Sequence, residues 1–207
     1  TKTYTRDIAY ATMECCSYRY NPYDKAKFEV NAHNWIDMSD EDYGVSLLND
    51  CKYGISAENS NMMLTLQKSG THPDTTGDTG IHEMSYSLLP HIGGFSADNA
   101  VAHAYAFNYQ PMIISGAAKV TPLVTVDQTN IICETIKPAE DINNAFVIRL
   151  YEAERTHTNC KIRLGRDVRK VSATNMLEED PVTLLSDNGE ISLSFTPFEI
   201  KTILAEY

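Results

Sequence analysis

The side chains best placed to bind a ligand lie in two short polar segments. In residues 48–54, Asn49 and Asp50 offer hydrogen-bond donor and acceptor groups for hydroxyls, and Tyr53 offers an aromatic face for C–H contacts. The competing interpretation is an Asx-type turn whose side chains satisfy their own backbone. The segment is therefore a candidate binding loop with a structural alternative.

The second segment, residues 72–80, gathers His72, Asp74 and Asp78 beside glycines. Because glycine lacks a side chain, Gly80 would let a ligand approach the backbone closely. Asp50 and Asp78 could also supply the two carboxyl groups that retaining glycoside hydrolysis requires, although carboxylates are common in acidic loops. We therefore treat the segment first as a binding loop.

Other chemistries find little support in the residue pattern. The four histidines at 72, 82, 91 and 103 match no helical or hairpin spacing of metal ligands, so we expect no metal site within the chain. There is no Gly-x-Ser-x-Gly elbow, P-loop or G-x-G-x-x-G motif. Trp35, the only tryptophan, could stack on a sugar ring but is more typical of a core residue.

Composition narrows the class of partner. Among 207 residues the formal net charge is -11, which disfavours nucleic acid and anionic membrane as partners. No apolar stretch has the length of a membrane span, and no basic start leads into an apolar signal core. Five cysteines without a C-x-x-C pair indicate free thiols and a cytoplasmic location.

Alternating apolar residues predict strands along most of the chain. Met62, Leu64 and Leu66 share one face of a predicted strand, and Met84, Tyr86 and Leu88 share one face of another, as in half-buried strands. An Asn-Gly pair at 188–189 predicts a tight hairpin turn. Further strands are predicted at residues 146–151, 160–164 and 191–195.

One short helix interrupts the strand pattern, at about residues 97–107. Ser96 can cap its free amides, and Pro111 follows its end. The strand pattern lapses between 109 and 120, so we place a domain boundary near residue 118. The chain is then an all-β antiparallel sandwich assembly with domains at 1–118 and 119–207.

Several blocks resemble the non-catalytic half of family 38 glycoside hydrolases, the zinc-dependent α-mannosidases. They are residues 28–54, the loop and strand at 69–91 with its His-x-x-x-Tyr-x-Leu-x-Pro-His order, and the blocks 146–153, 174–179 and 195–202. The resemblance implies that 1–118 belongs to a large twisted supersandwich of galactose-mutarotase-like fold. Residues 119–207 would form a smaller C-terminal β-sandwich.

The resemblance also implies where the chemistry lies. An N-terminal catalytic domain outside this chain would bind zinc through His and Asp side chains and supply an Asp nucleophile and a second carboxylic acid. The chain would support removal of terminal α-mannose from oligosaccharides, be silent by itself, and pack on that domain as its partner. The residues expected to rim the pocket are Asn49, Asp50, Tyr53, His72, Asp74, Asp78 and Gly80.

This chain departs from the family pattern at one position of the second loop. Many relatives carry Arg between the matching Asp and Gly, whereas Thr79 stands there here, so a charged contact at that spot is in doubt. Three other functions remain open. They are a carbohydrate-binding module without hydrolytic activity, an enzyme of the mutarotase or epimerase kind, and an interaction domain that forms a homo-oligomer.

Overall fold

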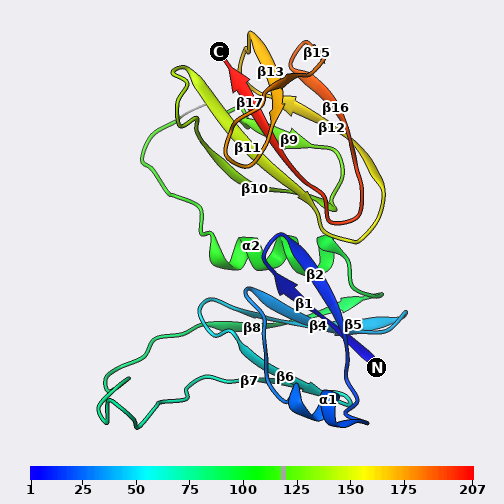
Figure 1. The fold of residues 1–207 in the computed structure, drawn as a ribbon, viewed down its shortest axis with the longest axis vertical. Coiled ribbons are helices and arrows are strands. Elements are labelled where there is room, and N and C mark those ends of the chain that lie inside the picture. Colours follow the sequence, from blue (N-terminus) through cyan, green and yellow to red (C-terminus); the bar gives the residue numbers. More distant parts are fainter. Residues whose placement is uncertain (118–119) are drawn as a thin grey trace. The chain divides into compact units, whose positions relative to one another are not determined.

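The computed structural model describes residues 1–117 and 120–207, which form two compact units, Thr1–Pro111 and Met112–Tyr207. We call them unit 1 and unit 2 and describe each by itself (Figure 1). The domain boundary expected near residue 118 lies outside the described residues.

Unit 1 contains two antiparallel sheets. The larger has the strand order β2-β1-β4-β5-β8, and the smaller has the order β3-β6-β7. The larger sheet consists of β1 (Thr3–Ile8), β2 (Ala11–Cys16), β4 (Trp35–Ser39), β5 (Tyr43–Asn49) and β8 (Tyr86–Ile92). The smaller consists of β3 (Val30–Asn31), β6 (Gly54–Glu58) and β7 (Asn61–Leu64).

The two sheets of unit 1 enclose an apolar core between them. Side chains at alternate positions of β1, β4 and β5 meet side chains of β6, because successive strand residues point to opposite faces. The core residues are Tyr4, Ala32, Ile36, Met38, Leu47, Ile55 and Ala57. Burial of this apolar surface is the main favourable term holding the two layers together.

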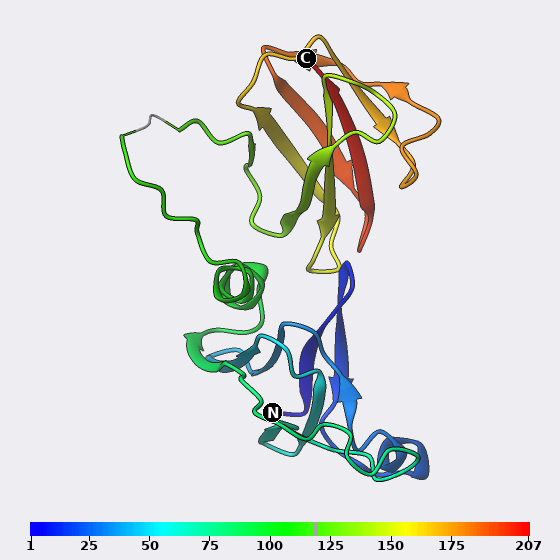
Figure 2. The same cartoon turned by 90° about the vertical axis from the view of Figure 1, so that its left-hand side faces the viewer.

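A helical segment covers the other face of the larger sheet of unit 1 (Figure 2). It begins as a π-helical turn, η1 (Ala97–Val101), and continues as α2 (Ala102–Asn108). The Ser96 hydroxyl accepts a hydrogen bond from the Asn99 amide at 3.0 Å, so the predicted cap is confirmed. Trp35 is buried and stacks on Phe95 at 5.0 Å, which confirms it as a core residue.

A second helix in unit 1 was not expected from the sequence. The five-residue α1 (Pro22–Ala26) has Asn21 as its N-cap, whose side chain accepts from the Asp24 amide at 2.9 Å. The Asp24 carboxylate accepts in return from the Asn21 amide, which completes a capping box. None of the residues of α1 is buried, so there was no apolar periodicity for the sequence to display.

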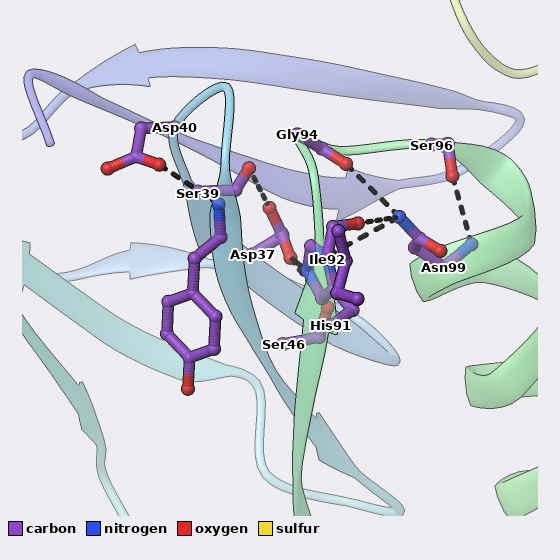
Figure 3. A network of polar contacts seen from close by, with 10 residues as sticks. Asp37, Ser39, Asp40, Ser46, His91, Ile92, Gly94, Ser96 and Asn99 are labelled. Atoms are coloured by element: carbon purple, nitrogen blue, oxygen red, sulfur yellow. Dashed lines mark hydrogen bonds and ion pairs between the residues drawn. The ribbon is translucent and has the colours of Figure 1, made fainter.

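The larger sheet of unit 1 holds a fully buried carboxylate, that of Asp37 on β4 (Figure 3). The hydroxyls of Ser39 and Ser46 each donate to it at 2.6 Å, and His91 Nε2 lies 2.7 Å from Asp37 Oδ2. Asn99 of η1 lies beside the other ring nitrogen of His91, with Nδ2 to Nδ1 at 3.4 Å. The network thus joins β4, β5, β8 and the helix.

Gly44 on β5 leaves the space that the His91 ring occupies. A Cβ atom at Gly44 would lie 2.3 Å from His91 Cε1 and 2.5 Å from the Ser39 Cβ. Contacts this short do not occur between carbon atoms, so any larger residue would displace the histidine from Asp37.

Strand β8 requires a correction to the expected burial. Tyr86 and Leu88 share a face as expected, but that face is exposed, at 56% and 64%. The half-buried residues are Ser87, Leu89 and His91, which point toward the helical segment. Strand β8 is an edge strand that the smaller sheet does not cover, which the alternation in the sequence could not reveal.

Unit 2 is a sandwich of two antiparallel sheets with the strand orders β10-β11-β17-β13-β14 and β15-β16-β12-β9. The first comprises β10 (Ile131–Pro138), β11 (Ala145–Glu152), β13 (Lys170–Thr174), β14 (Val182–Thr183) and β17 (Ile200–Glu206). The second comprises β9 (Val124–Val126), β12 (Thr158–Leu164), β15 (Ser186–Asp187) and β16 (Glu190–Phe195). Asn188 and Gly189 both have positive φ in the β15–β16 turn, as predicted.

Unit 2 also buries one carboxylate completely. Glu152, at the end of β11, accepts hydrogen bonds from the side chain of Asn130 at 3.0 Å and from the amides of Glu154 at 2.8 Å, Thr156 at 3.1 Å and Phe198 at 3.1 Å. Four donors compensate the desolvation of the charge and fix two loops at this end of the sandwich.

The all-β sandwich class with a short helix at 97–108 is therefore confirmed. Among the described residues, no helix combines the length and apolar character needed to cross a bilayer.

The contact at Gly44 leads to a prediction about stability. We expect Gly44→Ala to lower the free energy of unfolding of unit 1 by about 1–3 kcal/mol, because the added methyl group displaces His91 from Asp37. Urea unfolding followed by the fluorescence of Trp35, the single tryptophan, measures unit 1 selectively. Gly70→Ala is the control, since a Cβ there meets no atom within 4 Å. Equal midpoints for the two variants would contradict the prediction.

Candidate functional site

Two loops of unit 1 emerge side by side because of the pairing of β5 with β8. The register places Asn49, the last residue of β5, opposite Tyr86, the first residue of β8. Beyond this pair the Asp50 amide donates to the Ser85 carbonyl at 3.2 Å, and the Ser85 amide donates to Asp50 Oδ2 at 2.9 Å. Residues 50–53 and the long loop 65–85 therefore leave the sheet together.

The two loops border a shallow polar hollow of about 270 Å³. Lys52 comes from the first loop, and the other lining residues come from the second. They are Lys52, Thr65, Leu66, Gln67, Lys68, Asp78 and His82. The lining residues thus include two with ammonium groups, one with a carboxylate, one with an imidazole and one with an amide. This set of donors and acceptors suits a ligand with several hydroxyl groups.

Asp78 is the predicted site residue that the structure places in this hollow. Its φ of 59° is in the left-handed region, and its backbone oxygen lies 2.7 Å from His82 Nε2. A carbonyl oxygen only accepts hydrogen bonds, so Nε2 is the donor in this contact. The bond holds the His82 ring against the turn that contains Asp78.

Asn49 is engaged in the backbone of its own loop. The side chain is buried, donates to the His33 carbonyl at 2.9 Å and accepts from the Lys52 amide at 2.7 Å. This is the local satisfaction expected of the turn interpretation. Contact of Asn49 with a ligand stays a prediction. Its present hydrogen bond to the Lys52 amide fixes the backbone of Lys52.

Asp50 is exposed and closes the gap between the two loops. Hydrogen bonds from the Cys51 thiol and then from the Ser85 amide hold the pKa of the Asp50 carboxyl below its usual value. The hydrogen bond to Asp50 is also the main cause that raises the pKa of the Cys51 thiol, followed by desolvation and by the charge of the carboxylate. Asp50 thus ties the start of β8 to the end of β5.

Tyr53, His72, Asp74 and Gly80 lie outside the lining of the hollow. The exposed Tyr53 ring packs edge-on against His33 at 5.7 Å. Asp74 is exposed and accepts from both the amide and the hydroxyl of Thr76 at 2.9 Å, and the Thr76 amide is the main cause of its lowered pKa. His72 and Gly80 are exposed, and Gly80 has a φ of 148°.

Sequence reasoning did not assign to the site the other polar members of the hollow, Lys52, Thr65, Gln67, Lys68 and His82. Lysine and glutamine are common in loops, so nothing in their spacing marked them. The signal that places Lys52 beside Asp78 is the register of β5 with β8, which the one-dimensional pattern does not contain.

The resemblance implies a zinc site in a catalytic domain outside this chain. No group of three His, Cys, Asp or Glu side chains within residues 1–117 and 120–207 is arranged to hold a metal ion. A zinc site needs at least three protein ligands, so no step through a metal is assigned to these residues.

Two family models match the chain. Residues 1–76 match the glycosyl hydrolases family 38 C-terminal domain. Residues 130–203 match the glycosyl hydrolases family 38 C-terminal beta sandwich domain.

Curated relatives match nearly the whole chain. Alpha-mannosidase 2C1 from Homo sapiens is 35% identical over 97% of the chain, and alpha-mannosidase G from Dictyostelium discoideum is 32% identical over 95%. The chain spans 20% of the human protein and 19% of the Dictyostelium protein, which is about a fifth of their length.

A solved structure has the same fold. An alpha-mannosidase from Enterococcus faecalis V583 superposes with a TM-score of 0.75 at 17% identity, over 100% of this chain and 24% of that one. At this identity the likeness concerns the fold.

The Asp50–Cys51 contact leads to a prediction about thiol reactivity. We expect Asp50→Asn to lower the pH midpoint of Cys51 alkylation by iodoacetamide, because the thiol loses its hydrogen bond to the carboxylate and the thiolate loses its repulsion by that charge. Alkylation rates are measured by mass spectrometry between pH 6 and 10, and their pH dependence gives the midpoint. A loop loosened by the substitution would change only the alkylation rate at the high-pH plateau. Cys16, which is exposed, serves as the internal control. An unchanged Cys51 midpoint would refute the contact.

Proposed function

The chain belongs to glycosyl hydrolase family 38, and we propose that it is the C-terminal β region of a longer α-mannosidase. The observation that carries this proposal is the 35% identity to an α-mannosidase over 97% of the chain. The relatives extend over about five times the length of this chain, so the longer enzyme would contain the catalytic domain elsewhere.

The proposed activity of that enzyme is hydrolysis of terminal non-reducing α-D-mannose from oligosaccharides, with retention of configuration. Retention requires two carboxyl groups about 5 Å apart on either side of the scissile bond. Zinc bound in the catalytic domain would supply Lewis-acid contacts to the sugar hydroxyls. Five free cysteines support a reducing, cytoplasmic setting for the enzyme.

In this proposal, unit 1 borders the substrate pocket and packs on the catalytic domain. The hollow between the loops would contact an outlying sugar of the oligosaccharide. Lys52 and Asp78 offer a donor and an acceptor within one hollow, which is the pairing that a vicinal diol requires. The rigid β5–β8 register supports both loops, so the groups would be held in place before substrate arrives.

The activity is tested by release of chromophore from an aryl α-mannoside. We expect release by the longer enzyme when it is loaded with zinc, loss of that release after chelation, and no release by the 207-residue chain alone. Release by the chain alone would place the catalytic carboxylates within it. Silence of both proteins would favour a carbohydrate-binding module instead.

The role of the hollow is tested in the longer enzyme with a mannose oligosaccharide. We expect Asp78→Ala to lower kcat/KM by about tenfold, which corresponds to the loss of one charge-assisted hydrogen bond. Glu41→Ala removes an exposed carboxylate from the β4–β5 turn and is the matched control. An Asp78→Ala enzyme with the kcat/KM of the control would remove Asp78 from the substrate site.

A further inference from the structure

Unit 1 contains a second cavity, on the side of β1 and β2, that the proposed function does not use. Its volume is about 350 Å³, and it lies among the β1–β2 hairpin, the segment around α1, and β6. The lining residues that matter here are Tyr4, Arg6, Met13, Cys15, Arg19 and Lys27. All of them belong to unit 1, so the cavity is complete within that unit.

Arg6 is the unusual group in this cavity. The residue is only 9% exposed, although its guanidinium group always carries a charge. Nη1 donates to the backbone and side-chain oxygens of Asn31, whereas Nη2 has only the thioether sulfur of Met13 at 3.0 Å. The Nε–H group is buried and has no hydrogen-bond partner.

Arg6 also lacks a counter-ion. No carboxylate of residues 1–117 and 120–207 forms an ion pair with it, whereas the neighbouring Arg19 pairs with Glu58 at 3.3 Å. A buried charge without an opposite charge is costly, and buried charges in proteins are paired almost without exception. The arrangement is therefore complete only with an anion beside Arg6.

The edge of Arg6 that lacks an acceptor has a defined shape. Nε–H and one N–H of Nη2 point the same way and form the fork that binds two oxygens of a carboxylate or phosphate. Met13 covers this fork through its sulfur, which is a weak acceptor. Met13 is 41% exposed and its side chain has three rotatable bonds, so it can swing away from the fork.

The remaining polar groups of the cavity are compatible with an anion. Lys27 adds a cation to those of Arg6 and Arg19. Burial and the neighbouring Cys15 raise the pKa of Tyr4 to about 12, so its hydroxyl stays a neutral donor. Glu14 and Asp24 also line the cavity, and Asp24 is committed to the capping box of α1. An oxyanion would thus meet donors from several sides.

We propose that this cavity is an oxyanion site in which a carboxylate or phosphate displaces Met13 and binds the Nε–H and Nη2–H fork of Arg6. The oxyanion could be a free small anion or a carboxylate side chain of polypeptide outside these residues. The chemistry at Arg6 is the same in both cases, and the experiment below separates them.

The first test uses the 207-residue chain with inorganic phosphate as the probe. Urea unfolding of unit 1 is followed by Trp35 fluorescence in sodium phosphate and in sodium chloride of equal ionic strength. At about ten times its dissociation constant, phosphate should raise the folded-to-unfolded ratio about tenfold. Exclusion of phosphate from protein surfaces also stabilises folded chains, so variants must isolate the part that depends on Arg6.

Arg6→Met and Arg6→Lys are the test variants. Met removes an unpaired buried charge and keeps the apolar stem, so the fold should be retained, and Lys keeps the charge but lacks the fork. Both should lose the tenfold effect. Arg149→Met is the control, since Arg149 also has a buried Nε–H without an acceptor but lies in unit 2, outside this cavity. An equal phosphate response in the unaltered chain and in Arg6→Met would overturn the proposal.

The second test identifies the source of the oxyanion and rests on the proposed longer enzyme. If a carboxylate of its own polypeptide fills the site, the longer enzyme should show no phosphate response dependent on Arg6, and Arg6→Met should destabilise it. If the anion is free, the longer enzyme should respond as the chain does. Neither effect in the longer enzyme would overturn the proposal, whatever its mannosidase activity.

Discussion

The burial of a carboxylate inside a β-sandwich is the constraint on which each unit depends. A desolvated carboxylate is tolerated only when several donors surround it, so its neighbours must be held in fixed positions. In unit 1, Asp37 requires two serine hydroxyls and His91. In unit 2, Glu152 requires Asn130 and three backbone amides. Asp37 joins three strands, and Glu152 joins a strand to loops, so both carboxylates fix positions that apolar packing alone leaves free.

Strand β8 connects the Asp37 network with the loops of the candidate site. His91 attaches β8 to Asp37 in one register, and that register sets which loop residues leave the sheet together. Lys52 and Asp78 share a hollow for this reason, although 25 residues separate them along the chain. The buried network and the candidate substrate site are therefore connected through β8.

Arg6 differs from these two carboxylates, because its hydrogen-bonding groups are only partly paired. It is 9% exposed, and among the residues that the structure describes its Nε–H bond has no acceptor and its charge has no opposite charge. The two buried carboxylates, in contrast, accept several hydrogen bonds each. The proposed oxyanion would give Arg6 the missing acceptor and an opposite charge. It would displace the Met13 side chain from the guanidinium group.

The sequence by itself determined the class of fold, the capped helix after Ser96, the Asn188–Gly189 turn and the family, because these depend on local periodicity, local capping and extended residue order. It also predicted the two loops that border the hollow, and their role in binding stays a prediction. Only the tertiary structure decided that the apolar face of β8 is exposed, that Asn49 serves its own backbone, and that Lys52 lies near Asp78. Those outcomes depend on which strand lies at an edge and in which register it pairs, and these long-range choices leave no mark in the local pattern.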